Sequence, residues 1–182
     1  KPCEAKGDSI LRRKIIVAIL ILFCFLLQST VFPGIAHGNT VPNLLIVLTA
    51  AFGFMRGEKE GLLIGFFCGL LADIFFGDAV GFYAMVMMYI GFLNGKFSGG
   101  FYPEDIKLPL ALIVVSDFSY GLICYIFLFL LRGKLDFPYY FLHVILPETI
   151  YTTVVTIFLY PIVLFVNVRL ENREKRGAKK FV

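Results

Sequence analysis

The chain has 182 residues, of which 59% are hydrophobic and 16% charged, with a formal net charge of +4 and a mean hydropathy of +0.84. Soluble domains are about 45–50% apolar, so this composition predicts an integral membrane protein and leaves no room for a soluble catalytic domain. The cations flank apolar segments, which argues against a nucleic-acid-binding surface and indicates orientation signals and contacts with membrane lipids.

Six apolar segments follow one another along the chain, and each is a candidate membrane-crossing helix. They are residues 14–32, 41–55, 61–76, 80–97, 108–131 and 138–168. The second and third are shorter than the ~20 residues that a perpendicular span needs, so we expect them to thin the bilayer, to tilt under neighbouring helices or to continue into flanking turns. The sixth is too long for one span, and we expect it to lie partly at the interface or to bend at Pro147 and Pro161.

The first segment follows a basic stretch, a pattern that membrane anchors share with cleaved signal peptides. Residues 28–33 offer no small-x-small cleavage site, which favours an uncleaved anchor. Cations also indicate orientation, because cytoplasmic loops are enriched in Lys and Arg. With both termini in the cytoplasm, 15 of the 17 Lys and Arg lie inside and only Arg132 and Lys134 lie outside. We therefore predict a cytoplasmic N-terminal segment (1–13), a six-helix transmembrane domain (14–168) and a basic cytoplasmic tail (169–182).

Gly61, Gly65 and Gly69 recur at four-residue spacing and form one stripe along the third predicted helix. Small residues at this spacing let two helix backbones approach closely in a bilayer, where no hydrophobic force draws helices together. The stripe predicts a helix-packing surface, either within the protein or toward a partner. We expect Gly65→Leu to break assembly, because a branched side chain does not fit where backbones touch.

Three acidic residues, Asp73, Asp117 and Glu148, lie inside the apolar segments. An ionisable group there is costly unless it faces protein or a water-filled cavity. Counting along the helices places all three in a mid-to-outer layer of the membrane, where Tyr120 and Thr152 accompany them. We expect these five residues to form a buried polar pocket that opens toward the outer face. Polar links between helices are the equally weighted alternative.

Enzyme signatures are absent from the sequence. It contains no HExxH, GxSxG or GxxxxGK[ST] motif and no His–carboxylate pair at a useful spacing. The four cysteines form no CxxC pair, and the two histidines are too scattered for a metal centre. We therefore predict that the protein is not an enzyme, has no catalytic residues and binds neither a metal nor a cofactor.

Several short motifs occur in a characteristic order over most of the chain, from about Arg12 to Glu171. They are Arg56-Gly57, the glycine stripe, Leu70-Leu71-Ala72-Asp73 and Gly91-Phe92-Leu93-Asn94-Gly95. In this order they resemble the MreD family of rod shape-determining proteins. The resemblance implies a multi-pass protein of the bacterial cytoplasmic (inner) membrane, whose membrane domain is similar in shape to the substrate-binding subunits of energy-coupling-factor transporters.

The same resemblance implies a non-enzymatic scaffold of the cell-wall elongation machinery, which helps to maintain cell shape. Its direct partner would be an MreC-like bitopic protein, with an MreB-like filament and the peptidoglycan synthases as indirect partners. The main alternative is a small-solute-binding subunit of a membrane transporter, which predicts saturable binding that depends on the carboxylates. A membrane enzyme for lipid-linked substrates is disfavoured, because the sequence shows no basic pocket for phosphates.

Overall fold

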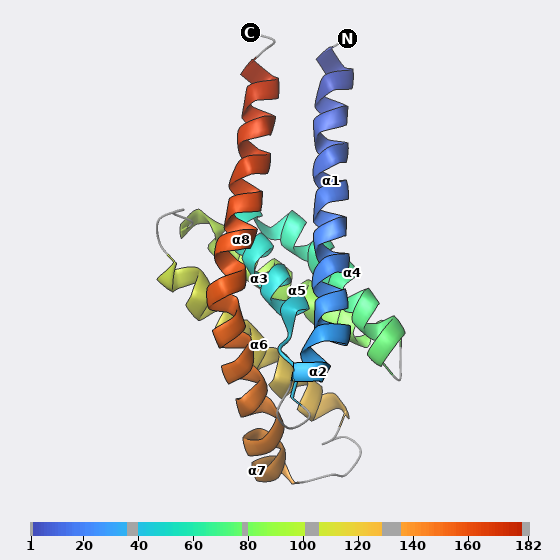
Figure 1. Cartoon of the computed structure of the whole chain (residues 1–182), viewed down its shortest axis with the longest axis vertical. Helices are drawn as coiled ribbons and strands as arrows, with labels where there is room; N and C mark the ends of the chain where they lie inside the picture. The colour runs from blue at the N-terminus through green and yellow to red at the C-terminus, as the bar shows by residue number, and fades with distance from the viewer. Residues whose placement is uncertain (1, 36–39, 78–79, 101–105, 129–135, 180–182) are drawn as a thin grey trace.

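The computed structural model shows a bundle of helices and describes residues 2–35, 40–77, 80–100, 106–128 and 136–179 (Figure 1). In this part of the chain every regular element is a helix, which confirms the predicted all-α class. The elements are α1 (Pro2–Leu26), η1 (Leu27–Val31), α2 (Phe32–Ile35), α3 (Leu44–Arg56), α4 (Glu58–Phe76), α5 (Phe82–Lys96), η2 (Phe97–Gly100), α6 (Lys107–Leu128), α7 (Phe137–Tyr140), η4 (Phe141–Ile145) and α8 (Leu146–Lys179).

Each of the six predicted apolar segments overlaps one helix or one run of abutting helices, but several helices extend beyond the apolar stretch. The helix of the third segment, α4, begins at Glu58 rather than Gly61. Gly57, just before it, adopts a positive φ of 96°, and the acidic residues of the first turn are favoured by the helix dipole. The last continues to Lys179. Hydropathy does not detect such polar helix ends. Residues 129–131 of the fifth segment lie outside the described residues.

Three described helices are long and apolar enough to cross a membrane: Leu11–Gly34, Lys107–Leu128 and Phe137–Asn172. α3 is equally apolar but has only 13 residues, against the ~20 that a perpendicular span needs. α5 has 15 residues, and α4 carries four charged residues among its 19. The chain is therefore a helical membrane protein with several apolar helices, and the six-span topology remains a prediction.

α3 lies at the centre of the bundle. Every side chain from Leu44 to Met55 is buried, and the helix contacts α1, α4, α5, α6 and α8. Its environment is therefore protein rather than lipid, so its length need not match the thickness of the bilayer. This burial accounts for the nearly continuous apolar run from Leu44 to Met55.

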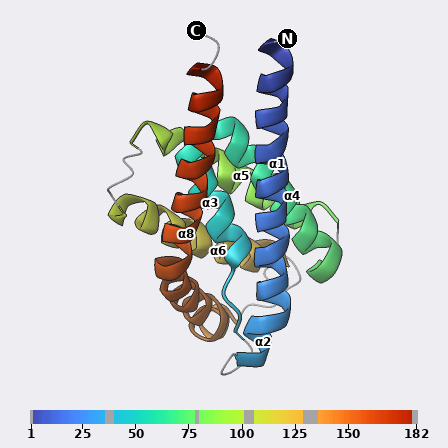
Figure 2. The ribbon, with the colours of Figure 1, turned by 45° about the horizontal axis from the view of Figure 1, so that its top comes forward.

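Two long helical runs form one side of the molecule, where α1 and α8 lie side by side with both chain termini at the same end (Figures 1 and 2). Each run contains a π-helical turn shortly before a proline: η1 precedes Pro33 and η4 precedes Pro147. Proline lacks the N–H that an α-helix needs, and a wider turn accommodates this loss. The bend predicted at Pro147 thus corresponds to η4, whereas Pro161 lies inside α8.

Candidate functional site

The glycine seam, defined here as Gly61, Gly65 and Gly69 of α4, faces α5 and α3. A methyl group on Gly61 would collide with the carbonyl of Gly91 and lie 2.7 Å from the Cα of Gly53. A methyl group on either of the other two would collide with the α5 backbone, at Met87 and at Tyr83–Ala84. The structure therefore places the seam inside the protein, where α5 covers it.

The neighbouring helices contribute glycines of their own to this contact. A methyl group on Gly91 of α5 would collide with the carbonyl of Gly61, and one on Gly95 would collide with the backbone of Glu58. Gly53 of α3 leaves similarly little room, because a methyl group there would lie 2.6 Å from the Gly91 oxygen. Reciprocal glycines thus hold α3, α4 and α5 at backbone contact.

Asp73 connects the end of α4 to the start of α5. Its Oδ1 accepts a hydrogen bond from the backbone N–H of Tyr83, and its Oδ2 accepts one from Ala84, both at 2.9 Å. The N-cap residue of α5 is Gly81, which has a φ of 107° and no side chain. It therefore cannot cap α5 with a side-chain hydrogen bond. A carboxylate at a helix N-terminus satisfies free N–H groups and is favoured by the helix dipole.

Asp117 of α6 and Glu148 of α8 lie close enough to interact electrostatically. Asp117 is only 2% exposed, and neither of its carboxylate oxygens has a hydrogen-bond partner in the described part of the chain. The hydroxyls of Thr149 and Thr152 lie near this carboxylate, and that of Thr152 also accepts a bond from the backbone N–H of Asn43 at 3.0 Å. The amide side chain of Asn43 faces Glu148.

A pocket of about 860 Å³ lies where several helix ends meet. Its walls come from η1, the starts of α3 and α5, the end of α4, the second half of α6, and the segment from Tyr140 to Glu148. Of the five predicted pocket residues, Tyr120 and Glu148 line it. The other three do not line it, but each interacts with a residue that does: Asp73 with Tyr83, Asp117 with Glu148, and Thr152 with Asn43.

Two polar side chains at this site have roles that the sequence reasoning missed. The Oδ1 of Asn43 caps α3 by accepting from the N–H of Ile46, and the Oε1 of Gln28 accepts from the N–H of Leu45, both at 3.3 Å. An Asn directly before an apolar run is a recognisable N-cap signal. The role of Gln28 has no such signal, because it depends on how α1 packs against α3.

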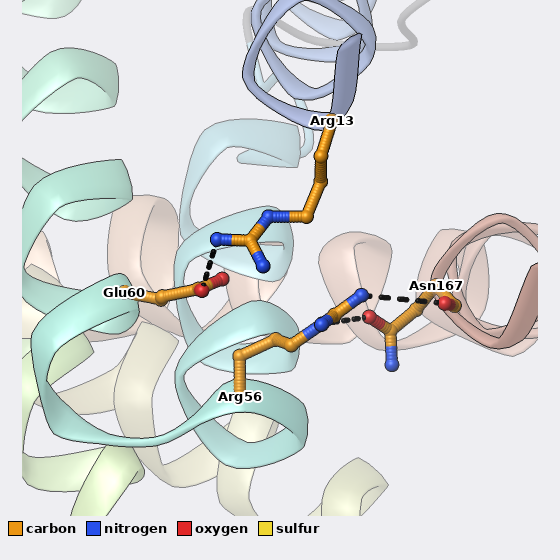
Figure 3. A network of polar contacts seen from close by, with 4 residues as sticks. All are labelled: Arg13, Arg56, Glu60 and Asn167. Atoms are coloured by element: carbon orange, nitrogen blue, oxygen red, sulfur yellow. Dashed lines mark hydrogen bonds and ion pairs between the residues drawn. The ribbon is translucent and has the colours of Figure 1, made fainter. Parts of the chain in front are cut away.

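A second polar cluster lies at the opposite end of α3 (Figure 3). Arg56, in the last turn of α3, donates hydrogen bonds to the side chain and the carbonyl of the fully buried Asn167 of α8. Arg13 of α1 forms an ion pair with Glu60 of α4. These contacts connect four helices at the end of the bundle where the two chain termini lie.

A family model described as rod shape-determining protein MreD matches residues 9–168, a range that includes the glycine seam and all the residues that line the pocket. No curated protein and no solved structure matches the chain. The similarity to the substrate-binding subunits of energy-coupling-factor transporters therefore remains a prediction.

Proposed function

This chain belongs to the MreD family of rod shape-determining proteins, and on that basis we propose that it is a non-enzymatic scaffold of the cell-wall elongation complex. Membership implies a role in rod shape determination. Our proposal adds that the protein crosses the bacterial inner membrane six times with both termini in the cytoplasm. There it docks the transmembrane helix of an MreC-like bitopic protein, and through it acts on an MreB-like filament and the peptidoglycan synthases.

The observation that carries this proposal, besides the family match, is that α4 has two different faces. The glycine seam faces inward, and the α4 outer face, defined as Leu63, Phe66, Phe67 and Ile74, is exposed on the other side of the helix. Internal packing occupies the seam, so a partner helix has to bind an outward face. Large aromatic side chains supply the van der Waals contact on which helix association in lipid depends.

The proposed docking surface is therefore the α4 outer face, and a paired substitution tests it. We expect Phe67→Ala with Ile74→Ala to lower the yield of the MreC-like partner in detergent co-purification by about tenfold, equivalent to ~1.4 kcal/mol. The matched control is Phe158→Ala with Ile162→Ala, which removes the same two side-chain types from an equally exposed part of α8. The control should keep the complex intact.

Each other outcome has a distinct meaning. Equal loss or equal retention in the two double variants would remove the α4 outer face as the docking surface. No complex with the unaltered chain would reject the scaffold proposal itself. The second candidate, a small-solute-binding subunit of a transporter, would then become the leading one. The feature that favours this candidate is the pocket of about 860 Å³, a size typical of ligand sites.

A further inference from the structure

The described residues that line the pocket include a carboxylate but no Lys or Arg. Glu148 lines it, and the buried carboxylate of Asp117 lies close by. His143 lies at the exposed rim, where its ring stacks on Tyr139 and its Nδ1 meets the Tyr139 carbonyl at 3.0 Å. Glu148 is half-buried with the amide side chain of Asn43 beside it, and a carboxylate partly removed from water is costly unless hydrogen bonds or an opposite charge compensate it in full.

The N-terminus of α3 adjoins the pocket, but its N–H groups donate no hydrogen bond to Glu148 within the described residues. Two backbone N–H groups at the start of α3 donate to other acceptors. The N–H of Leu45 donates to the Oε1 of Gln28, and the N–H of Ile46 donates to the Oδ1 of Asn43. The N–H of Asn43 itself donates to Thr152. Glu148 is therefore not required as a cap for α3, whereas Asp73 is committed to α5. This difference leaves Glu148 as the acidic group available to a ligand.

Aromatic rings surround the same space. The rings of Tyr83 and Tyr120 lie 6.1 Å apart, those of Phe82 and Phe127 lie 5.8 Å apart, and all four residues line the pocket together with Tyr140. Aromatic faces attract cations, most strongly where water is excluded. A carboxylate within such walls suits a positively charged group and repels an anion.

We propose that this pocket binds a primary ammonium group carried on an apolar body, with Glu148 as the counter-ion and the aromatic walls around it. The π-helical turns η1 and η4 both contribute lining residues, and such turns are frequent at functional sites. The ammonium comes either from a free amine or from a lysine side chain of a polypeptide. This inference does not depend on the scaffold role, because the pocket and the proposed docking face have no residue in common.

Binding to the purified chain in detergent micelles tests the proposal. The probe is tryptamine, with the uncharged analogue tryptophol and the anionic indole-3-propionate as controls. The chain contains no Trp, so the indole fluorescence anisotropy reports the probe alone. A second arm compares the peptide acetyl-Phe-Lys-Phe-amide with its acetyl-lysine counterpart by calorimetry, which separates a free amine from a lysine side chain as the source.

We expect saturable binding of at least one cationic probe, and about tenfold or more weaker binding in Glu148→Gln, because a charge-assisted hydrogen bond is lost. The matched control is Glu58→Gln, which removes the same charge from an exposed position at the far end of α4 and should bind like the unaltered chain. If Glu148→Gln does not fold, Tyr140→Leu removes an aromatic wall without altering the charge and should weaken binding several-fold.

Two results would overturn the proposal. The first is the absence of saturable binding of either cationic probe to the folded chain. The second is binding that uncharged or acetylated controls reproduce, or that survives both Glu148→Gln and Tyr140→Leu. Because the unmodified chain is tested without its partner, neither result bears on the co-purification experiment, and the scaffold role stands or falls separately.

Discussion

Asp73 and Asp117 are two nearly inaccessible carboxylates, 1% and 2% exposed, with opposite hydrogen-bonding situations. Each oxygen of Asp73 accepts one backbone N–H at the start of α5. Neither oxygen of Asp117 accepts any hydrogen bond within the described residues. The first carboxylate is therefore a structural cap, and the second belongs to a buried polar group with Thr149, Thr152 and Glu148.

At Gly65 even a methyl group should be costly. An added Cβ would lie 2.8 Å from the carbonyl carbon of Met87 and 3.0 Å from the Cγ2 of Thr49, and backbone cannot move away as a flexible side chain can. We expect Gly65→Ala to destabilise the chain by about 1–3 kcal/mol. The measurement is the thermal unfolding midpoint of the detergent-solubilised protein, followed by size-exclusion chromatography.

The control for this substitution is Gly34→Ala, because no atom lies within 4 Å of the added methyl group. It should leave the midpoint almost unchanged. Equal midpoints for Gly65→Ala and the unaltered chain would contradict the close packing of α4 on α5. The larger change Gly65→Leu should prevent folding, so a loss of assembly in that variant would report the fold and not a partner surface.

At the scale of elements, α3 is held at both ends by side chains from other helices. Gln28 of η1 and Thr152 of α8 bind its N-terminal region, and Asn167 of α8 accepts hydrogen bonds from Arg56 at its C-terminal end. The α8 contacts span 109 and 111 residues of sequence. These polar contacts at its two ends, together with the close approach of Gly53 to α5, set the position of α3 along its axis.

The contact between Arg56 and Asn167 should contribute measurably to stability. A hydrogen bond to a charged group is worth about 1.5–3 kcal/mol, and Asn167 is fully buried. We expect a double-mutant cycle of Arg56→Met and Asn167→Leu to give a coupling free energy in that range. The reversible unfolding of the chain in mixed micelles provides the measurement.

The pair Arg13–Glu60 serves as the comparison within the same cluster. Its two side chains are 19% and 28% exposed, and partly exposed ion pairs are usually worth less than about 1 kcal/mol. A cycle of Arg13→Met and Glu60→Leu should therefore give the smaller coupling. The reverse order of the two couplings would show that α8 is not held to α3 by Arg56.

At the scale of the whole molecule, the pocket lies at the N-terminal end of α3, and the polar cluster that contains Arg13 and Arg56 lies at its C-terminal end (Figure 3). Residues from the end of α4, the start of α5 and the second half of α6 line the pocket. Both chain termini lie at the other end of the bundle (Figure 1). Six alternating crossings would produce this distribution. Together with the excess of Lys and Arg near the termini, it supports an orientation with the pocket toward the outer face.

Reporter fusions test this topology. We expect alkaline phosphatase to be active when fused after Leu128, at the end of α6, and inactive when fused after Val182. Green fluorescent protein fused at the same two positions should give the opposite pattern, because it becomes fluorescent in the cytoplasm. The same activity at both positions would exclude an odd number of crossings between them, and with it the six-span arrangement.

The protein class, the helical segments and the family could be predicted from the amino-acid sequence alone. These properties depend on local composition: an apolar run predicts a helix wherever it packs, and the ordered motifs match the MreD family over residues 9–168. The seam residues Gly61, Gly65 and Gly69 were recognisable for the same reason, because their spacing along one helix defines a stripe. The Asn43 cap also had a local signal that could have been used.

The contacts between residues of different helices could not be predicted from the sequence and follow from the fold. From the sequence, Asp73, Asp117 and Glu148 were three equivalent carboxylates, and the fold assigns one to a helix cap and brings the other two together. The roles of Gln28 and Asn167 likewise follow from contacts between distant helices. Such contacts depend on how helices pack in three dimensions, because polar groups buried in the bundle bind whichever partners the packing places beside them.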